Sequence, residues 1–128
     1  MITEDYVSFE VAKLLKEKGF DKFSYYGWNE QLFDKEHPRN FSIGIDDKKQ
    51  WISCHTHQMA VKWLREVHKV LIVIDAYHAD HWEGYIDSFE ISIYRHASTI
   101  IVPNEIAHHT DYTEAVEAAL KYSLENLL

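Results

Sequence analysis

Three residues in the second half of the chain have side chains that could bind a metal ion. His78, Asp80 and His81 lie close together in the segment His78-Ala79-Asp80-His81-Trp82-Glu83. Zinc and similar divalent metals accept imidazole and carboxylate ligands, and Glu83 or a distant histidine could supply a fourth. The spacing matches no known metal motif and turns tolerate polar residues freely, so the favoured interpretation is a solvated hairpin tip. A metal-dependent hydrolase that uses these three residues is therefore the alternative hypothesis.

Cys54, the only cysteine, precedes a predicted helix in the segment Cys54-His55-Thr56-His57. A helix N-terminus favours the nucleophilic thiolate, and His78 could act as its base in a papain-like arrangement. The characteristic sequence around such a nucleophile is missing, however, and the other interpretation is a half-buried thiol beside a threonine cap. A single cysteine forms no internal disulfide, which fits a reducing cytoplasm.

Aromatic residues make up 14% of the chain, and some of them could form a binding surface. Tyrosine and tryptophan offer large, stiff contact area at recognition sites, although they are also ordinary strand residues. We expect most of them to be core and the remainder to line a groove near the strand ends. The aromatic candidates for binding a ligand or partner are Tyr6, Phe9, Trp28, Trp82 and Tyr85.

Phe9 lies on the predicted solvent side of the first helix. Val7 and Val11 belong to the inward stripe, and at about 100° per residue Phe9 is about 200° from Val7. A loop from residues 29–40 could cover the Phe9 ring, or the ring could simply be exposed. Alternatively, Tyr6 and Phe9 anchor a second subunit or a partner protein, and a twofold homodimer is the simplest form of such a contact.

The composition is that of an acidic globular protein. Of the 128 residues 46% are hydrophobic, and 21 acidic against 13 basic residues give a net charge of −8. The clustered basic residues of a nucleic-acid surface are missing, and no apolar run approaches the roughly 20 residues of a membrane span. The N-terminal segment also lacks the features of a signal peptide. We therefore expect a cytoplasmic protein that binds neither nucleic acid nor membrane.

Hydrophobic spacing predicts three amphipathic helices and five strands. The helices cover residues 4–18, 57–68 and 112–127, with Thr56 and Asp111 as caps of the second and third. The strand segments are 23–28, 41–45, a return beginning at Trp51, 70–77 and 85–94, and residues 78–84 turn the chain. The order α-β-β-β-α-β-β-α with short turns predicts a mainly antiparallel sheet covered by three helices. The expected fold is one α+β domain over residues 1–128, a two-layer sandwich.

Three helical segments resemble a known group of proteins. They are ITEDYVSFEVAKLLKEKGF (2–20), THQMAVKWLREVH (56–68) and YTEAVEAALKYSLENL (112–127). These segments, somewhat under half of the chain, are similar to a group of small uncharacterised proteins from gut Bacteroidales genomes and their phages. The resemblance implies a phage or mobile-element context, and it implies no activity and no site.

The sequence contains no glycine-rich phosphate loop, nucleophile elbow, zinc-type cysteine pair or DNA-reading motif. We therefore expect no cofactor and favour a protein without enzymatic activity. The leading hypothesis is an accessory protein of a phage or mobile element that binds a protein or a small ligand.

Overall fold

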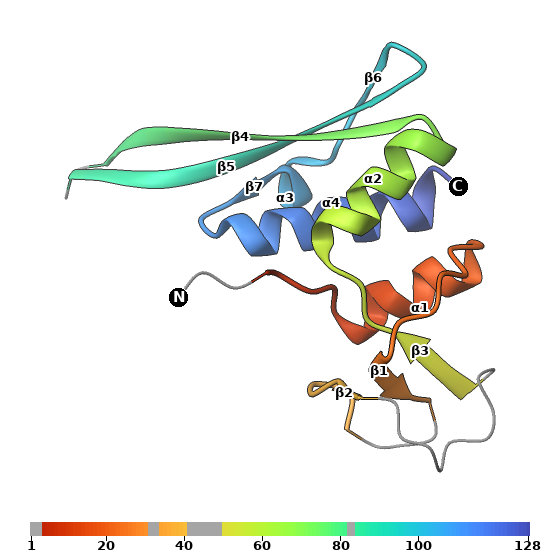
Figure 1. Ribbon diagram of the computed structural model, residues 1–128. Helices are drawn as coiled ribbons and strands as arrows, with labels where there is room; N and C mark the ends of the chain where they lie inside the picture. The colour runs from red at the N-terminus through yellow and green to blue at the C-terminus, as the bar shows by residue number, and fades with distance from the viewer. Residues whose placement is uncertain (1–3, 31–33, 41–49, 82–83) are drawn as a thin grey trace. The chain divides into compact units, whose positions relative to one another are not determined.

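The computed structural model describes residues 4–30, 34–40, 50–81 and 84–128, with the backbone alone for 77–81 and 84–87 (Figure 1). The chain divides into two compact units, an N-terminal unit, Met1–Ala60, and a C-terminal unit, Val61–Leu128. The described residues form four helices and two antiparallel sheets. The α+β class is confirmed, and the strands are distributed over two sheets. A single domain over residues 1–128 remains a prediction.

The N-terminal unit consists of one helix and a small sheet. Its elements are α1 (Phe9–Glu17), β1 (Tyr26–Asn29), β2 (Arg39–Asn40) and β3 (Trp51–Ser53). The strands follow the order β2-β1-β3, and both pairings are antiparallel. Helix α1 packs beside β3. Glycine is required at position 27, where β1 pairs with β3, because a Cβ there would overlap the carbonyl oxygen of Ile52.

Helix α1 begins later than the sequence predicts. Tyr6 forms an isolated antiparallel bridge with Thr56, and the Val7 amide donates a hydrogen bond of 3.0 Å to the His55 carbonyl. These pairings hold the chain extended before the helix, because a backbone group used in a bridge is not available to a helix. Ser8 then caps α1, since its hydroxyl oxygen accepts from the Val11 amide at 3.2 Å.

Helix α2 (His57–Val67) begins in the N-terminal unit and ends in the C-terminal unit. The predicted Thr56 cap is confirmed, because its Oγ1 accepts from the Met59 amide at 3.1 Å. The apolar spacing of this helix predicts that Ala60, Leu64 and Val67 face inward. Ala60 and Leu64 are buried, whereas Val67 is 59% exposed. The last turn therefore contributes less to the core than its apolar spacing suggested.

The C-terminal unit is built on a long hairpin of β4 (Val70–His81) and β5 (Gly84–Arg95) (Figure 1). Its other elements are β6 (Ser98–Ile100), α3 (Asn104–Ala107), β7 (His108–His109) and α4 (Tyr112–Asn126). The sheet order is β4-β5-β6, and β7 pairs with β5. Helix α4 packs on β4 and β5, and the predicted Asp111 cap is confirmed by its Oδ1, which accepts from the Glu114 amide at 3.2 Å.

Helix α3 is a single turn that the hydrophobic spacing did not reveal. It follows Pro103, whose carbonyl accepts from the amides of Ile106 and Ala107 at 2.9 and 3.0 Å. None of the described helices is both long enough and apolar enough to span a bilayer.

Candidate functional site

The three predicted metal ligands lie on a strand. The sequence predicted a turn over residues 78–84, but β4 continues through His81 and pairs in register with β5. This pairing places His78 opposite Asp87 and Asp80 opposite Tyr85. Because successive strand positions alternate between faces, positions 78 and 80 belong to one face and position 81 to the other. Their side chains lie outside the described part of the chain, and among the described side chains no cluster of three His, Cys, Asp or Glu could hold a metal.

Two of the aromatic candidates lie in the same hairpin. Trp82 falls outside the described residues. Tyr85 belongs to β5 by its backbone, and its side chain is not described. The binding role expected for these two residues therefore stays a prediction.

The other three aromatic candidates lie in the N-terminal unit and pack against residues of that unit. The Phe9 ring meets the Trp28 ring edge to face, with centroids 5.5 Å apart, and Lys35 Nζ lies 4.6 Å from the Phe9 centroid. Trp28 is only 4% exposed and belongs to the core. Tyr6 contacts Tyr26 at 5.2 Å between centroids and remains 46% exposed. Of the three, Tyr6 offers the largest accessible surface.

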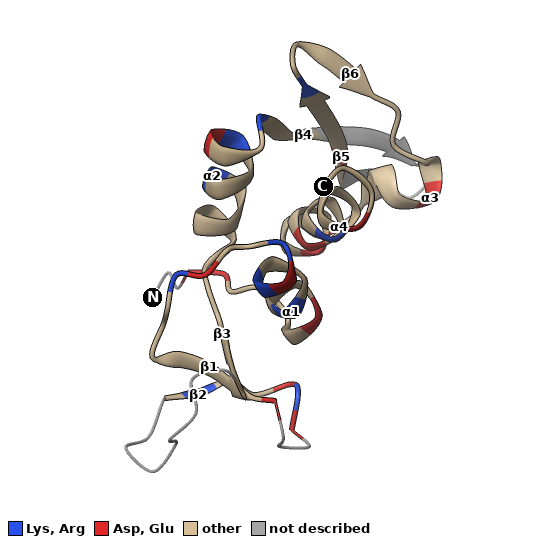
Figure 2. Ribbon diagram, turned by 90° about the vertical axis from the view of Figure 1, so that its right-hand side faces the viewer, with Lys and Arg blue, Asp and Glu red and all other residues tan. Residues whose placement is uncertain are grey.

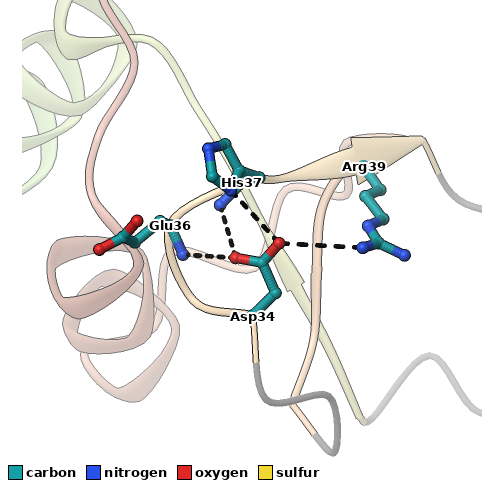
Figure 3. Close-up of polar contacts among 4 residues, drawn as sticks. All are labelled: Asp34, Glu36, His37 and Arg39. Atoms are coloured by element: carbon teal, nitrogen blue, oxygen red, sulfur yellow. Dashed lines mark hydrogen bonds and ion pairs between the residues drawn. The ribbon is translucent and has the colours of Figure 1, made fainter.

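An exposed turn supports this packing. Asp34 Oδ1 accepts hydrogen bonds of 3.1 Å from the backbone amides of Glu36 and His37, and Oδ2 lies 3.3 Å from His37 Nδ1 and 3.8 Å from Arg39 Nη2 (Figure 3). The hydrogen bonds from the Glu36 and His37 amides hold the pKa of Asp34 below its ordinary value. This turn positions the segment that carries Lys35, and it is an exposed arrangement with a local structural role.

Cys54 is a packed core residue. It is 2% exposed, and its Sγ lies 3.5 Å from the Val7 carbonyl oxygen, to which the thiol donates. A thiol so enclosed is inaccessible to a substrate, and catalytic thiols need an accessible, electropositive setting. The geometry therefore fits the packed thiol beside a threonine cap rather than the nucleophile.

A pocket of about 240 Å³ opens beside α1 in the N-terminal unit. Five of its ten lining residues are buried, and its three charged lining residues are exposed. The lining residues are Ala12, Leu15, Lys16, Phe20, Asp21, Lys22, Phe23, Trp51, Ser53 and His55. An apolar interior with a few polar groups at its edge is the usual construction of a small-molecule site.

Helix spacing and the end of α1 position one side of the pocket. Leu15 and Lys16 lie three and four positions after Ala12, so the three share one face of the helix. The helix ends at Glu17 with Lys18 as its C-cap, and the next residue, Gly19, has a φ of 98°. The Gly19 amide donates to the Lys16 carbonyl at 3.2 Å and the Phe20 amide to the Leu15 carbonyl at 2.9 Å. This Schellman motif turns the chain back so that Phe20 lies near the last turn of the helix.

Strand β3 positions the other side. Trp51 and Ser53 of this strand line the pocket, and so does His55, which lies two residues past its end. Trp51 Nε1 donates to the Ser24 carbonyl at 2.8 Å, and Ser53 Oγ accepts from the Ser24 amide at 3.0 Å. Lys16 Nζ donates to the Trp51 carbonyl at 3.3 Å, which links the ammonium group to strand β3. Hydrogen bonds to the backbone therefore hold both walls in place.

His55 is a buried imidazole at the pocket wall. It is 8% exposed, and its ring meets the Phe20 ring edge to face at 4.5 Å. Burial lowers the pKa of His55; a hydrogen bond with the Lys22 backbone works in the opposite direction, and the positive charge of Lys22 lowers the pKa further. The neutral imidazole is therefore the resting form near pH 7.

The charges at the pocket are unlike those of the whole chain. Two lysines, Lys16 and Lys22, and one acid, Asp21, give the lining a net charge of +1 with His55 neutral, whereas the chain carries −8. Figure 2 shows that acidic and basic residues are interspersed along α1. Among the described residues that line the pocket, basic side chains therefore outnumber acidic ones, the reverse of the whole chain.

Sequence spacing alone does not reveal this pocket. Trp51 begins a predicted strand and His55 follows Cys54, but the spacing connects neither residue with the lysines near the end of α1. The usable signals were Gly19-Phe20 at the helix end and the alternation of Trp51, Ser53 and His55.

Neither a protein-family model, nor a curated protein, nor a solved structure matches the chain. The case for a function therefore depends on the geometry of the pocket.

Proposed function

We propose that the protein is a non-enzymatic accessory protein of a phage or mobile element, acting in the cytoplasm, and that it binds a small ligand in the pocket between α1 and β3. The resemblance of its three helical segments supports the biological context. The pocket, with its buried aromatic walls and charged rim, is the observation that supports ligand binding.

The hydroxyl at the pocket supports binding rather than catalysis. Ser53 Oγ accepts from the Ser24 amide at 3.0 Å and donates to the Ser24 carbonyl at 3.4 Å. The hydroxyl thus links two backbone segments, and an activated serine would instead be hydrogen-bonded to a general base. His55 likewise has its ring packed on Phe20. The pocket is therefore suited to holding a molecule.

Native mass spectrometry of protein isolated from its natural host tests the proposal. The wild-type protein should carry a small organic molecule. Ala12→Leu, which adds bulk to the pocket floor, should lose it. Ala118→Leu provides the control, because Ala118 is a half-buried helical alanine of the C-terminal unit and should leave the molecule bound.

Two results would contradict this function. One is a stoichiometric metal ion in place of an organic molecule, which would favour the hydrolase alternative at His78, Asp80 and His81. The other is a protein that retains nothing and whose amide resonances over residues 12–23 and 51–55 are unmoved by a library of small fragments.

A further inference from the structure

We infer that the ligand of this pocket is a small aromatic monoanion, a single ring that carries one carboxylate. The inference rests on the proposed function and adds the chemical class of the ligand. It is carried by three properties of the lining: its volume, its aromatic walls and its charge.

The volume limits the ligand to about one substituted ring. A cavity of roughly 150 Å³ can hold benzene, whereas pockets for drug-sized molecules begin at roughly 300 Å³. At about 240 Å³ the pocket lies between these values. A six-membered ring with one small polar group fits this range, and the pocket is too small to enclose a nucleotide or a peptide.

The walls favour a flat, apolar ring. Phe20, Phe23 and Trp51 line the pocket together, and each has a further contact within the N-terminal unit. Phe20 packs on His55, Tyr25 meets Phe23 edge to face at 4.9 Å, and Trp51 is hydrogen-bonded to Ser24. Aromatic rings held in fixed orientation gain most from stacking or edge contacts with another ring.

The charge of the rim selects an anion with a single charge. The Lys16 ammonium is hydrogen-bonded to the Trp51 carbonyl, and the Lys22 charge acts on His55 inside the pocket. These two cations come from α1 and from the loop that follows it, so a carboxylate at the rim would meet positive charge from both. Asp21 is also a lining residue, so a second negative charge on the ligand would be repelled by its carboxylate, which disfavours a dianion.

Titration of ¹⁵N-labelled protein at pH 7.5 with sodium benzoate tests the inference. Benzoate should shift the amide resonances of residues 12–23 and 51–55 saturably. Benzamide has the same ring and nearly the same shape without the charge, and it should bind about fivefold more weakly, the range expected for a partly exposed charge pair. Benzylammonium should bind more weakly than either, and acetate should cause no saturable shift.

Lysine variants locate the charge effect. Lys22→Gln and Lys16→Gln should each weaken benzoate binding about threefold to fivefold and leave benzamide binding unchanged. Lys13→Gln is the matched control, because Lys13 is an exposed lysine of α1 that does not line the pocket. A dispersed amide spectrum verifies that each variant is folded.

The outcomes separate the two proposals. Equal binding of benzamide and benzoate, or a preference for benzylammonium, would overturn the anion assignment and leave a small-ligand pocket standing. Failure of all four probes to shift these resonances would also overturn the inference, and the fragment library then decides whether the proposed function falls with it. Benzoate binding that is weakened equally by Lys13→Gln would show that general charge, and not the pocket, attracts the anion.

Discussion

The ring of Phe9 contacts the ring of Trp28 edge to face, with 5.5 Å between centroids and 83° between planes. Lys35, from the turn held by Asp34, lies against the same phenylalanine. Phe9 thus has packing partners within its own unit, which matches the interpretation in which a loop from residues 29–40 covers it. An edge-to-face pair and a cation over a ring each add about 0.5–1.5 kcal/mol to the apolar burial.

Phe9→Ala should therefore lower the free energy of unfolding by about 2 kcal/mol, roughly half the cost at a fully buried phenylalanine. Phe9→Leu, which keeps most of the volume, should cost less than about 1.5 kcal/mol. Urea denaturation measures both, and sedimentation of the same samples reports the oligomeric state. A variant of unchanged stability that converts a dimer to a monomer would restore Phe9 as an interface anchor.

Acidification should destabilise the protein through His55. Burial makes its pKa in the folded state lower than the ordinary value of about 6.5. The unfolded state therefore binds more protons as the pH falls below about 6.5, so stability declines until the folded-state pKa has been passed. Urea denaturation at pH 7.5, 6.5 and 5.5 measures the free energy of unfolding, which should decline less in His55→Gln than in the wild-type protein. His96→Gln, at an exposed turn, is the control. An equal dependence of the free energy of unfolding on pH in the two variants would exclude His55 as a source of the acid destabilisation.

The hairpin turn between β5 and β6 stores strain that a glycine should relieve. His96 and Ala97 both have positive φ, 51° and 64°, and a side chain disfavours this conformation by about 1 kcal/mol. Ala97→Gly should raise the melting temperature and stabilise by about 0.5 kcal/mol. The same change inside α4, Ala118→Gly, should instead cost about 1 kcal/mol. Destabilisation by Ala97→Gly would contradict the strained turn.

Two glycines of the N-terminal unit should respond differently to alanine. A Cβ at Gly27 would overlap the Ile52 carbonyl, so Gly27→Ala must separate β1 from β3 and should cost about 3 kcal/mol or more. Gly19 has φ of 98° with open space around it, so Gly19→Ala should cost only about 1 kcal/mol. Thermal melting compares the two, and equal losses would show that β1 and β3 do not approach so closely.

The local parts of the fold could be predicted from the sequence. Helices α2 and α4 begin at the residues that follow the predicted caps, Thr56 and Asp111. These starts could be predicted because the cap residue and the first apolar residues of each helix lie within a few positions of each other in the sequence. The antiparallel character followed from short connections between strands. Such features depend on residues that are neighbours along the chain, and their spacing is visible directly.

Tertiary structure decided the rest, because it depends on which distant backbone groups and side chains meet. Helix α1 starts at Phe9 rather than near Glu4 because Tyr6 and Val7 pair with Thr56 and His55. The pocket likewise needs the end of α1 and strand β3, and the hydrogen bond from Lys16 to Trp51 spans 35 positions of sequence. Helical periodicity indicates which residues turn inward; it carries no information on which segment they meet there, since that follows from strand pairing and packing.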